Sequence, residues 1–487
     1  MSAPSPADPK KQLRRVMGFW DVLLFNIAAV LGPRWVAAAA HNGTSSISLW
    51  VLSALFFFFP TTMVISELST RYPEEGGLYV WSKEAFGDFH GFVAGWTYWV
   101  YTFFYFPGLL TASVSMTAYV GGSSTAALAQ NRTFLLTGSL VLLFAAVFLN
   151  IIGLNIGKWL QNAGGVSTYA PLLILVAVAG AVWVHQGSQT HFTWHNIIPT
   201  WHWGTVNFWS QIVFAFVGLE LVSAMSEEIR EPRRTIPRAV FGSGILITVI
   251  YLAATIAVLV LMPSGDVDPK SGVFQAVTYG AAALKMGIVG MIAAMLVTVG
   301  NTGGVGSTVA GVARVPFVVG IDRYLPAAFG KIHSKWKTPW VSILVQAVIS
   351  GVILLLIQIN ETVNGAYQIL VDAAIILYFV PFLYMYAAAI KLSSRKDRTS
   401  NPESVLIPGG KLGVWVAGGL GFSTVLAGIA FSMVPPSETA NPIVFELKLV
   451  GCSAAAIGIG LALYFRGVRA KEREAAASTR RTSSELA

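Results

Sequence analysis

The sequence predicts an all-α membrane protein with twelve transmembrane helices, and three observations lead to this prediction. Of the 487 residues, 55% are hydrophobic and only 11% are charged, whereas a soluble domain carries about 25% charged residues. The apolar residues form runs of the length that a spanning helix needs, roughly 20 residues. Lys and Arg are concentrated in alternate connecting segments, as the positive-inside rule requires. One membrane domain is therefore expected.

Twelve apolar runs are interpreted as spans because each is long enough to cross the hydrocarbon core. The first five lie at residues 16–40, 46–70, 89–118, 133–153 and 163–184. The next five lie at 205–226, 239–262, 281–318, 339–357 and 366–390, and two more follow at 412–433 and 443–466. The polar start MSAPSPADPKKQLRR lacks the pattern of a cleaved leader, so the first run is expected to remain in the protein. The final segment, KEREAAASTRRTSSELA, is expected to be a short disordered tail that contacts anionic lipid.

The positive charges give an independent test of this topology. With both termini in the cytoplasm, 27 of the 32 Lys and Arg residues fall in inner segments and four fall in outer segments, while Arg34 lies inside the first run. This split indicates a multi-pass protein of the cell membrane, plasma or inner, with both termini cytoplasmic. The net charge of +9 follows from the topology, so no nucleic-acid partner is expected.

Two of the predicted spans are interrupted near their middle. The first contains Gly32-Pro33, followed at once by Arg34, and the sixth contains Gly218 and Glu220. Broken backbone in a membrane is tolerated only where it is buried in protein or lines a cavity. Interrupted helices at matching positions of two halves are the best sequence indication of a transporter's binding site, although each break alone is more often a simple kink.

Three segments resemble the amino acid, polyamine and organocation (APC) permeases. FAFVGLELVSAMSEEIREPRRTIPRA (214–239) resembles the sixth-span signature of this superfamily. ELSTRYPEEGGLYVWSKEAFGDFHGFVAGW (67–96) resembles its loop between spans two and three, and STVAGVARVPFVVGIDRYLPAAFGKIHSKWKTPW (307–340) its eighth span and following loop. The resemblance implies a secondary transporter with a LeuT-like fold, in which five-plus-five inverted repeats are followed by two additional C-terminal helices. Alternating access around a midplane site is also implied.

This resemblance divides the chain into five parts. They are a cytoplasmic N-terminal tail (1–15), a first repeat with spans 1–5 (16–204), a second repeat with spans 6–10 (205–390), spans 11–12 (391–466) and a cytoplasmic C-terminal tail (467–487). Two departures from the family pattern appear. The small Gly-x-Gly element of span one, whose amides hold a substrate carboxylate in the family, is replaced by Ala29-Val30-Leu31 before Gly32, and the lysine that some proton-coupled relatives carry in span five is absent.

Three ionisable residues within the spans need partners, because a charge at mid-bilayer is costly. They are Arg34, Glu220 and Asp372. Arg34 has three open roles: it binds the substrate carboxylate, it closes an outer gate with Asp372, or it pairs permanently with Glu220. Since arginine keeps its proton, Glu220 is the leading candidate for a coupling proton. A fixed cation favours neutral or acidic amino acids and disfavours polyamines.

The expected substrate-binding residues surround the two breaks. They are Ala29, Val30, Leu31, Gly32, Arg34, Phe214, Phe216, Val217 and Gly218. Arg34, Glu220 and Asp372 are the candidate gate or coupling residues, and Ser307 and Thr308 are either ion ligands or small residues for helix packing. No cofactor or metal site is expected, because Cys452 is the single cysteine and the outer-loop histidines lack ordered carboxylates.

The predicted function is secondary transport of an amino acid, by proton symport or exchange. A non-transporting nutrient sensor on the same scaffold and a polyamine transporter are the alternatives. No HExxH, GxSxG or Walker motif occurs, so an enzyme is not expected. The sequence leaves open which amino acid is carried, whether sodium or protons are coupled, and the oligomeric state.

Overall fold

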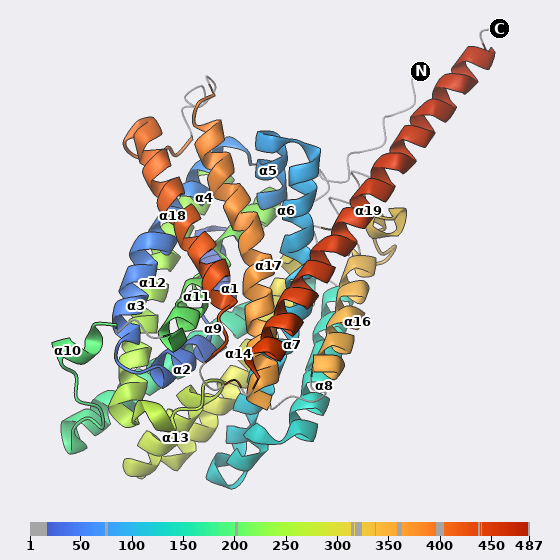
Figure 1. The fold of residues 1–487 in the computed structure, drawn as a ribbon. Coiled ribbons are helices and arrows are strands. Elements are labelled where there is room, and N and C mark those ends of the chain that lie inside the picture. The colour runs from blue at the N-terminus through green and yellow to red at the C-terminus, as the bar shows by residue number, and fades with distance from the viewer. Residues whose placement is uncertain are drawn as a thin grey trace.

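A computed structural model describes residues 17–73, 76–152, 154–199, 203–312, 316, 324–336, 338–357, 363–395, 404–436, 439 and 441–485. In this part of the chain the regular structure is helical, apart from one isolated bridge between Met17 and Ile229 (Figure 1). The described residues include nine helices that are long and apolar enough to cross a membrane, and one bent pair makes a tenth. Two shorter apolar helices, Gly287–Gly300 and Trp340–Leu356, lie among them. The all-α membrane prediction is confirmed, while the count of twelve stays a prediction.

The helices up to residue 186 follow the first five predicted runs closely. They are α1 (Phe19–Val30), α2 (Pro33–His41), α3 (Ser46–Ser53), the π-helix η2 (Ala54–Phe58), α4 (Phe59–Arg71), α6 (Asp88–Val100), α7 (Thr102–Thr117), α8 (Arg132–Ile152) and α9 (Leu154–Gln186). Between α4 and α6 lies α5 (Leu78–Phe86), and η3 (Ala118–Ser124) and η4 (Ala126–Gln130) connect α7 to α8.

The second part of the chain begins with the short helix α10 (Trp194–Ile197). Its further helices are α11 (Trp203–Ala215), η5 (Leu219–Glu228), α12 (Pro232–Leu261), α13 (Gly272–Ala283), α14 (Gly287–Val312), α16 (Trp340–Ile357), α17 (Val363–Leu392), α18 (Gly410–Ser432) and α19 (Pro442–Glu485). The short helices η6 (Ser264–Asp266) and η7 (Ala327–Gly330) lie in loops. α1 packs on α12, α9 and η5, which places the interrupted segments inside the bundle.

Two sequence-based boundaries are corrected. The predicted span at 281–318 begins inside α13, which is a separate helix: Lys285 has a left-handed φ of 57° and the Met286 N–H bonds to the Ala281 carbonyl at 2.7 Å. The residue in the left-handed conformation is a lysine, and AALKMGIV contains no proline, so the boundary was missed. The expected disordered tail is instead the end of α19, which continues to Glu485 and extends from the bundle (Figure 1). Its Ala, Glu, Lys and Arg residues have high helix propensity.

Asp268 organises the segment between α12 and α13. Its Oδ1 accepts hydrogen bonds from the Lys270 N–H (2.9 Å) and from the N–H (2.8 Å) and hydroxyl (2.9 Å) of Ser271. Its Oδ2 accepts a bond from Gln130 (2.7 Å) and lies 3.5 Å from the Lys270 ammonium. Burial raises the pKa of Asp268, but Lys270 and Ser271 outweigh it and hold the pKa below its usual value. The Asp268 carboxylate therefore ties the start of α13 to η4.

Candidate functional site

The first break separates α1 from α2. Leu31 and Gly32 are extended (ψ 114° and 118°), and the two helices are bent by 41°. Pro33 begins α2 because proline has no N–H to continue the preceding helix and its fixed φ suits a first helical turn. The Leu31 N–H keeps a bond to the Ile27 carbonyl (2.8 Å). The break in the first span was correctly predicted.

The second break separates α11 from the 3-10 helix η5. Gly218 has φ +119°, a conformation that glycine adopts without the strain other residues meet. A β-carbon on Gly218 would lie 3.2 Å from Val30 Cγ2 and 3.4 Å from the Ala29 carbonyl oxygen. The two breaks are therefore in direct contact.

The hydroxyl of Tyr251, on α12, joins both breaks. It accepts a bond from the Gly32 N–H (3.1 Å) and lies within donor distance of the carbonyls of Val30 (2.8 Å) and Ala215 (3.1 Å). Tyr251 is fully buried, and its ring stacks on Trp50 at 4.3 Å between centroids. One neutral hydroxyl thus forms hydrogen bonds with backbone groups that have no helical partner because the two helices are interrupted.

Glu220 lies at the start of η5 and is held by neutral donors. Its Oε1 accepts bonds from the hydroxyls of Tyr98 (2.9 Å) and Tyr378, and its Oε2 accepts one from the Gly218 N–H (3.0 Å). Tyr98 belongs to α6 and Tyr378 to α17. The carboxylate therefore links three helices at the second break, and the side chain is buried (2% exposed).

Arg34 lies just after the first break, in the first turn of α2, and is 3% exposed. Its guanidinium carbon lies 4.3 Å from the centroid of the Trp35 ring and 4.7 Å from that of Tyr105. The buried Nη2 atom has no hydrogen-bond partner. Cation–π contacts of this kind stabilise a cation only in part.

Neither of the two carboxylates that the sequence suggested as partners reaches Arg34 in this conformation. Glu220 and Asp372 both belong to the described part of the chain, and neither forms an ion pair with Arg34. Asp372 is fully buried on α17, where its Oδ2 accepts bonds from Gln368 (3.0 Å) and Asn207 (3.5 Å). Its Oδ1 has no hydrogen-bond partner.

Aromatic side chains fill the space between Arg34 and Glu220, and most of them were missed from the sequence. Tyr98, Tyr101 and Tyr105 follow one another at spacings of three and four along α6 and α7, so they lie on one face. Tyr101 packs edge-on against Tyr378 at 4.3 Å between centroids. The i, i+3, i+7 spacing in the sequence could have indicated that the three tyrosines share one helix face.

The two predicted phenylalanines have different surroundings. Phe214 packs edge-on against Trp35, Tyr105 and Tyr378, with centroids 5.5–6.0 Å apart, so it belongs to this aromatic group. Phe216 packs instead against Trp50, Phe58 and Tyr251.

The remaining predicted residues differ in burial, and two of them are not described. Val30 and Leu31 are buried, while Ala29, Gly32 and Val217 are half-buried. The side chains of Ser307 and Thr308 lie outside the described residues.

A family model described as "Amino acid permease" matches residues 17–451. The chain belongs to the amino acid permease family. The predicted resemblance to the APC permeases is therefore confirmed, and the protein is a multi-pass transporter of this family.

Relatives of this permease include transporters of several kinds. An uncharacterized transporter of Legionella pneumophila is 29% identical and covers 90% of this chain and 94% of its own. The probable agmatine/putrescine antiporter AguD of Lactococcus lactis is 23% identical (85% and 87% covered), and the serine/threonine exchanger SteT of Bacillus subtilis is 25% identical (81% and 88%). All are transporters, which confirms that the permease is not an enzyme.

The permease also resembles a solved structure, that of MhsT in complex with L-phenylalanine. The TM-score is 0.62 at 14% identity, and the match covers 86% of this chain and 99% of MhsT. At this identity the likeness concerns the fold alone. The permease therefore shares the LeuT-like fold.

Proposed function

We propose that this permease is a secondary active transporter that moves an amino acid across the cell membrane by alternating access. Family membership, the LeuT-like fold and the contact between the two breaks support this proposal. The observation that carries it is the buried guanidinium of Arg34 beside the first break, which has no carboxylate partner among the described residues. Both termini are placed in the cytoplasm by the positive-inside rule.

Arg34 is the proposed binding group for the substrate carboxylate. A buried cation is costly unless an anion reaches it, and a carboxylate matches the planar guanidinium with two parallel hydrogen bonds. The amides of the first break are weaker candidates, because the Leu31 and Gly32 N–H groups already have partners. The gate and structural roles of Arg34 would require ion pairs that are not formed in this conformation.

The sign of this fixed charge also supports a substrate class. A cation at the site attracts a carboxylate and repels a diamine, so a neutral or acidic amino acid is the proposed substrate. SteT, named as a serine/threonine exchanger, agrees with this proposal, whereas AguD, named as an agmatine/putrescine antiporter, represents the competing class. Spans 6–10 are proposed to repeat spans 1–5 in inverted orientation.

Glu220 is the proposed coupling residue, for proton symport or for exchange. Its carboxylate accepts three hydrogen bonds from α6, α17 and Gly218. A proton bound to this carboxylate would remove its negative charge and add an O–H donor, so the three accepted bonds would weaken. The link between the three helices would then loosen. Because Arg34 supplies a positive charge beside the site, transport is proposed to be independent of sodium.

Uptake into proteoliposomes tests the proposal. Purified permease should accumulate a labelled neutral or acidic amino acid, without sodium, and should not accumulate putrescine. Arg34→Gln should abolish uptake, and Arg34→Lys should retain a fraction of it, because lysine keeps the charge but lacks the planar fork. Unchanged uptake by Arg34→Gln would remove the carboxylate role.

A second measurement distinguishes a transporter from a non-transporting sensor on the same scaffold. The sensor would be stabilised by the amino acid in a thermal-shift assay, since a ligand at 100 times its dissociation constant adds about 2.7 kcal/mol. It would nevertheless show no uptake into the vesicles.

A further inference from the structure

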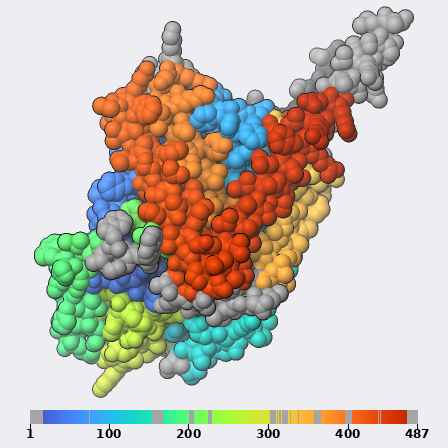
Figure 2. Space-filling model, in the orientation of Figure 1, coloured from blue at the N-terminus to red at the C-terminus, as the bar shows by residue number. Residues whose placement is uncertain are grey.

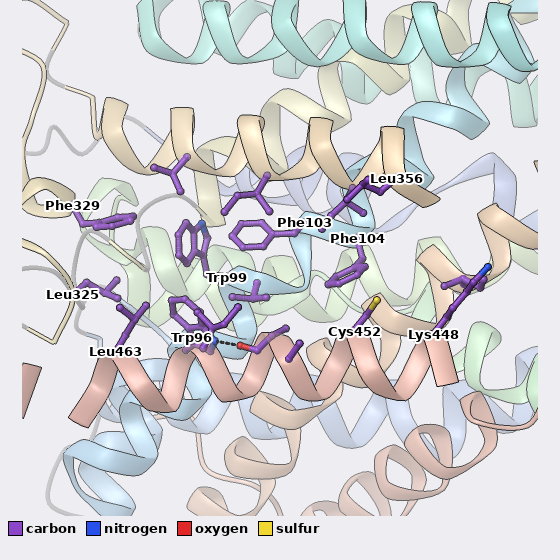
Figure 3. A pocket seen from close by; sticks show the side chains of 18 residues that line it. Trp96, Trp99, Phe103, Phe104, Leu325, Phe329, Leu356, Lys448, Cys452 and Leu463 are labelled. Atoms are coloured by element: carbon purple, nitrogen blue, oxygen red, sulfur yellow. Dashed lines mark hydrogen bonds between the residues drawn. The ribbon is translucent and has the colours of Figure 1, made fainter. Parts of the chain in front are cut away.

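A cavity of about 570 Å³ lies away from the helix breaks, between α16 and α19. α16 packs on α7 and α8, whereas α19 packs on α6 and α17. Figure 3 shows the cavity in the gap, with α16 and α19 on opposite sides and residues of α6 and α7 between them. Figure 2 shows α19 crossing this face of the protein obliquely, with α16 beside it. The cavity therefore lies at the periphery of the helix bundle.

The walls of this cavity are apolar and its mouth faces the membrane. Trp99 (2% exposed) and Phe103 (6% exposed) lie behind the mouth, while Leu356 (60%) and Ile459 (58%) lie at the surface. Because α7, α16 and α19 are membrane helices, the medium at the mouth is hydrocarbon and not water. An empty space of this size would leave its walls without contact atoms. Hydrocarbon chains are the molecules available to fill it.

We propose that this cavity binds an acyl chain of a phospholipid, with the phosphate of the lipid at Lys448. Of the eighteen described residues that line the cavity, Lys448 alone is charged, and it lies at one end while Leu463 lies at the other (Figure 3). The stem of a lysine packs along apolar surface while its ammonium reaches the polar boundary. A phosphodiester is the complementary charge that every phospholipid carries at the top of its chains.

The length of the cavity fits a single chain. From Lys448 to Leu463 the helix α19 rises about 22 Å, at about 1.5 Å per residue. One leaflet contributes about half of the ~30 Å hydrocarbon core. A chain of that depth that enters beside Lys448 therefore runs along about two-thirds of this stretch of α19 and stays within the cavity.

A photoreactive lipid gives a direct test in proteoliposomes. Phosphatidylglycerol with a diazirine in one acyl chain is incorporated, activated by light, and the labelled peptides are quantified by mass spectrometry. Labelling of residues 96–104 is the readout, because Trp99 and Phe103 are shielded from bulk lipid unless a chain enters the cavity. The readout is binding and not uptake, so the result does not depend on the proposed transport function.

A pair of neighbouring substitutions on α19 provides the matched comparison. Ala455 lines the cavity, whereas the adjacent Ala454 is exposed and does not line it. Ala455→Trp should fill the cavity and reduce labelling of 96–104 at least fivefold, while Ala454→Trp should leave it unchanged. Equal labelling in both variants, or none in the unaltered protein, would overturn the proposal.

The role of Lys448 is tested with a second lipid. Lys448→Gln should reduce labelling by the phosphatidylglycerol probe at least threefold and leave labelling by a diacylglycerol carrying the same diazirine chain unchanged. Equal losses with both lipids would refute phosphate recognition. Since Cys452 is the single cysteine and lines the cavity, an oxidised dimer crosslinked through Cys452 would show instead that a second copy covers this face, and that result would also overturn the proposal.

Discussion

Removal of one hydroxyl should uncouple the two helix breaks. In Tyr251→Phe the ring remains stacked on Trp50, but the Gly32 N–H loses its acceptor and the Val30 and Ala215 carbonyls lose their donor. A buried donor left without a partner costs about 1–3 kcal/mol. A central value of about 2 kcal/mol corresponds to a factor of about 30 in an equilibrium constant, since 1.4 kcal/mol is tenfold. The variant should therefore fold but lose the arrangement of breaks found here.

Substrate affinity and thermal stability should then respond together. If the paired breaks are the binding-competent form, the apparent affinity of Tyr251→Phe falls in proportion to the fraction of molecules that remain in that form. The fall should reach up to about 30-fold. Binding is measured by titration of the purified protein, and unfolding by its melting temperature in the same detergent. An affinity and a melting temperature equal to those of the unaltered protein would refute the reasoning.

A second tyrosine provides the control for a generic loss of one hydroxyl. Tyr386 is also fully buried, and its hydroxyl bonds to Thr61 at 2.5 Å and not to a backbone group of either break. In Tyr386→Phe the Thr61 hydroxyl keeps its bond to the Phe57 carbonyl (2.6 Å), so the cost should be about 1 kcal/mol. Affinity should be unchanged. If Tyr386→Phe weakened binding as much as Tyr251→Phe, the effect could not be assigned to the breaks.

Three further substitutions test other parts of the site and the segment between α12 and α13. Glu220→Gln keeps an acceptor but cannot exchange a proton, so the dependence of uptake on pH should be lost; a pH profile that matches the unaltered protein would contradict the coupling role. Gly218→Ala places a side chain at φ +119° and against Val30, which should cost roughly 1–2 kcal/mol and slow uptake at least tenfold, and uptake at the normal rate would show that the close contact is dispensable. The lowered pKa of Asp268 means that its carboxylate stabilises the fold above the unfolded pKa of about 3.9 and that this stability is lost as pH falls through the folded value. The melting temperature of Asp268→Asn should therefore lie below that of the unaltered protein at pH 7, and the difference should shrink towards pH 3; a constant difference would contradict this assignment.

The breaks were predictable because their causes are local. Pro33 cannot donate to the turn before it, and Gly218 can adopt a positive φ, and both properties belong to the residue itself. The spans were predictable for a similar reason, since apolar runs of membrane length are read directly from the chain. Where the cause is not local the prediction failed, as at Lys285, whose left-handed turn is not signalled by residue type.

The partners of the charged residues were not predictable, because they depend on which helices pack together. Tyr98 and Tyr378 lie 122 and 158 residues from Glu220, and nothing in their spacing along the chain indicates that one carboxylate receives both hydroxyls. The sequence suggested charged partners instead, namely Asp372 or Glu220 for Arg34. Tyrosine was overlooked because in an apolar run it is usually a packing residue.

The use of neutral donors at the breaks has a physical consequence for movement. Separating a buried ion pair between Arg34 and Glu220 would cost about 3–5 kcal/mol, because a buried charge would be left without its partner. The hydroxyls of two tyrosines bind Glu220, and the hydroxyl of Tyr251 binds backbone groups, through individual hydrogen bonds. Each bond contributes about 0.5–1.5 kcal/mol net, or about 1.5–3 kcal/mol when its partner is charged. Such bonds can be exchanged one at a time as the halves of the bundle move apart. Because Arg34 forms no ion pair with Glu220 or Asp372 here, in the proposed transport cycle a substrate carboxylate would reach it without first breaking a salt bridge, and its binding energy would remain available to shift the bundle between two open forms.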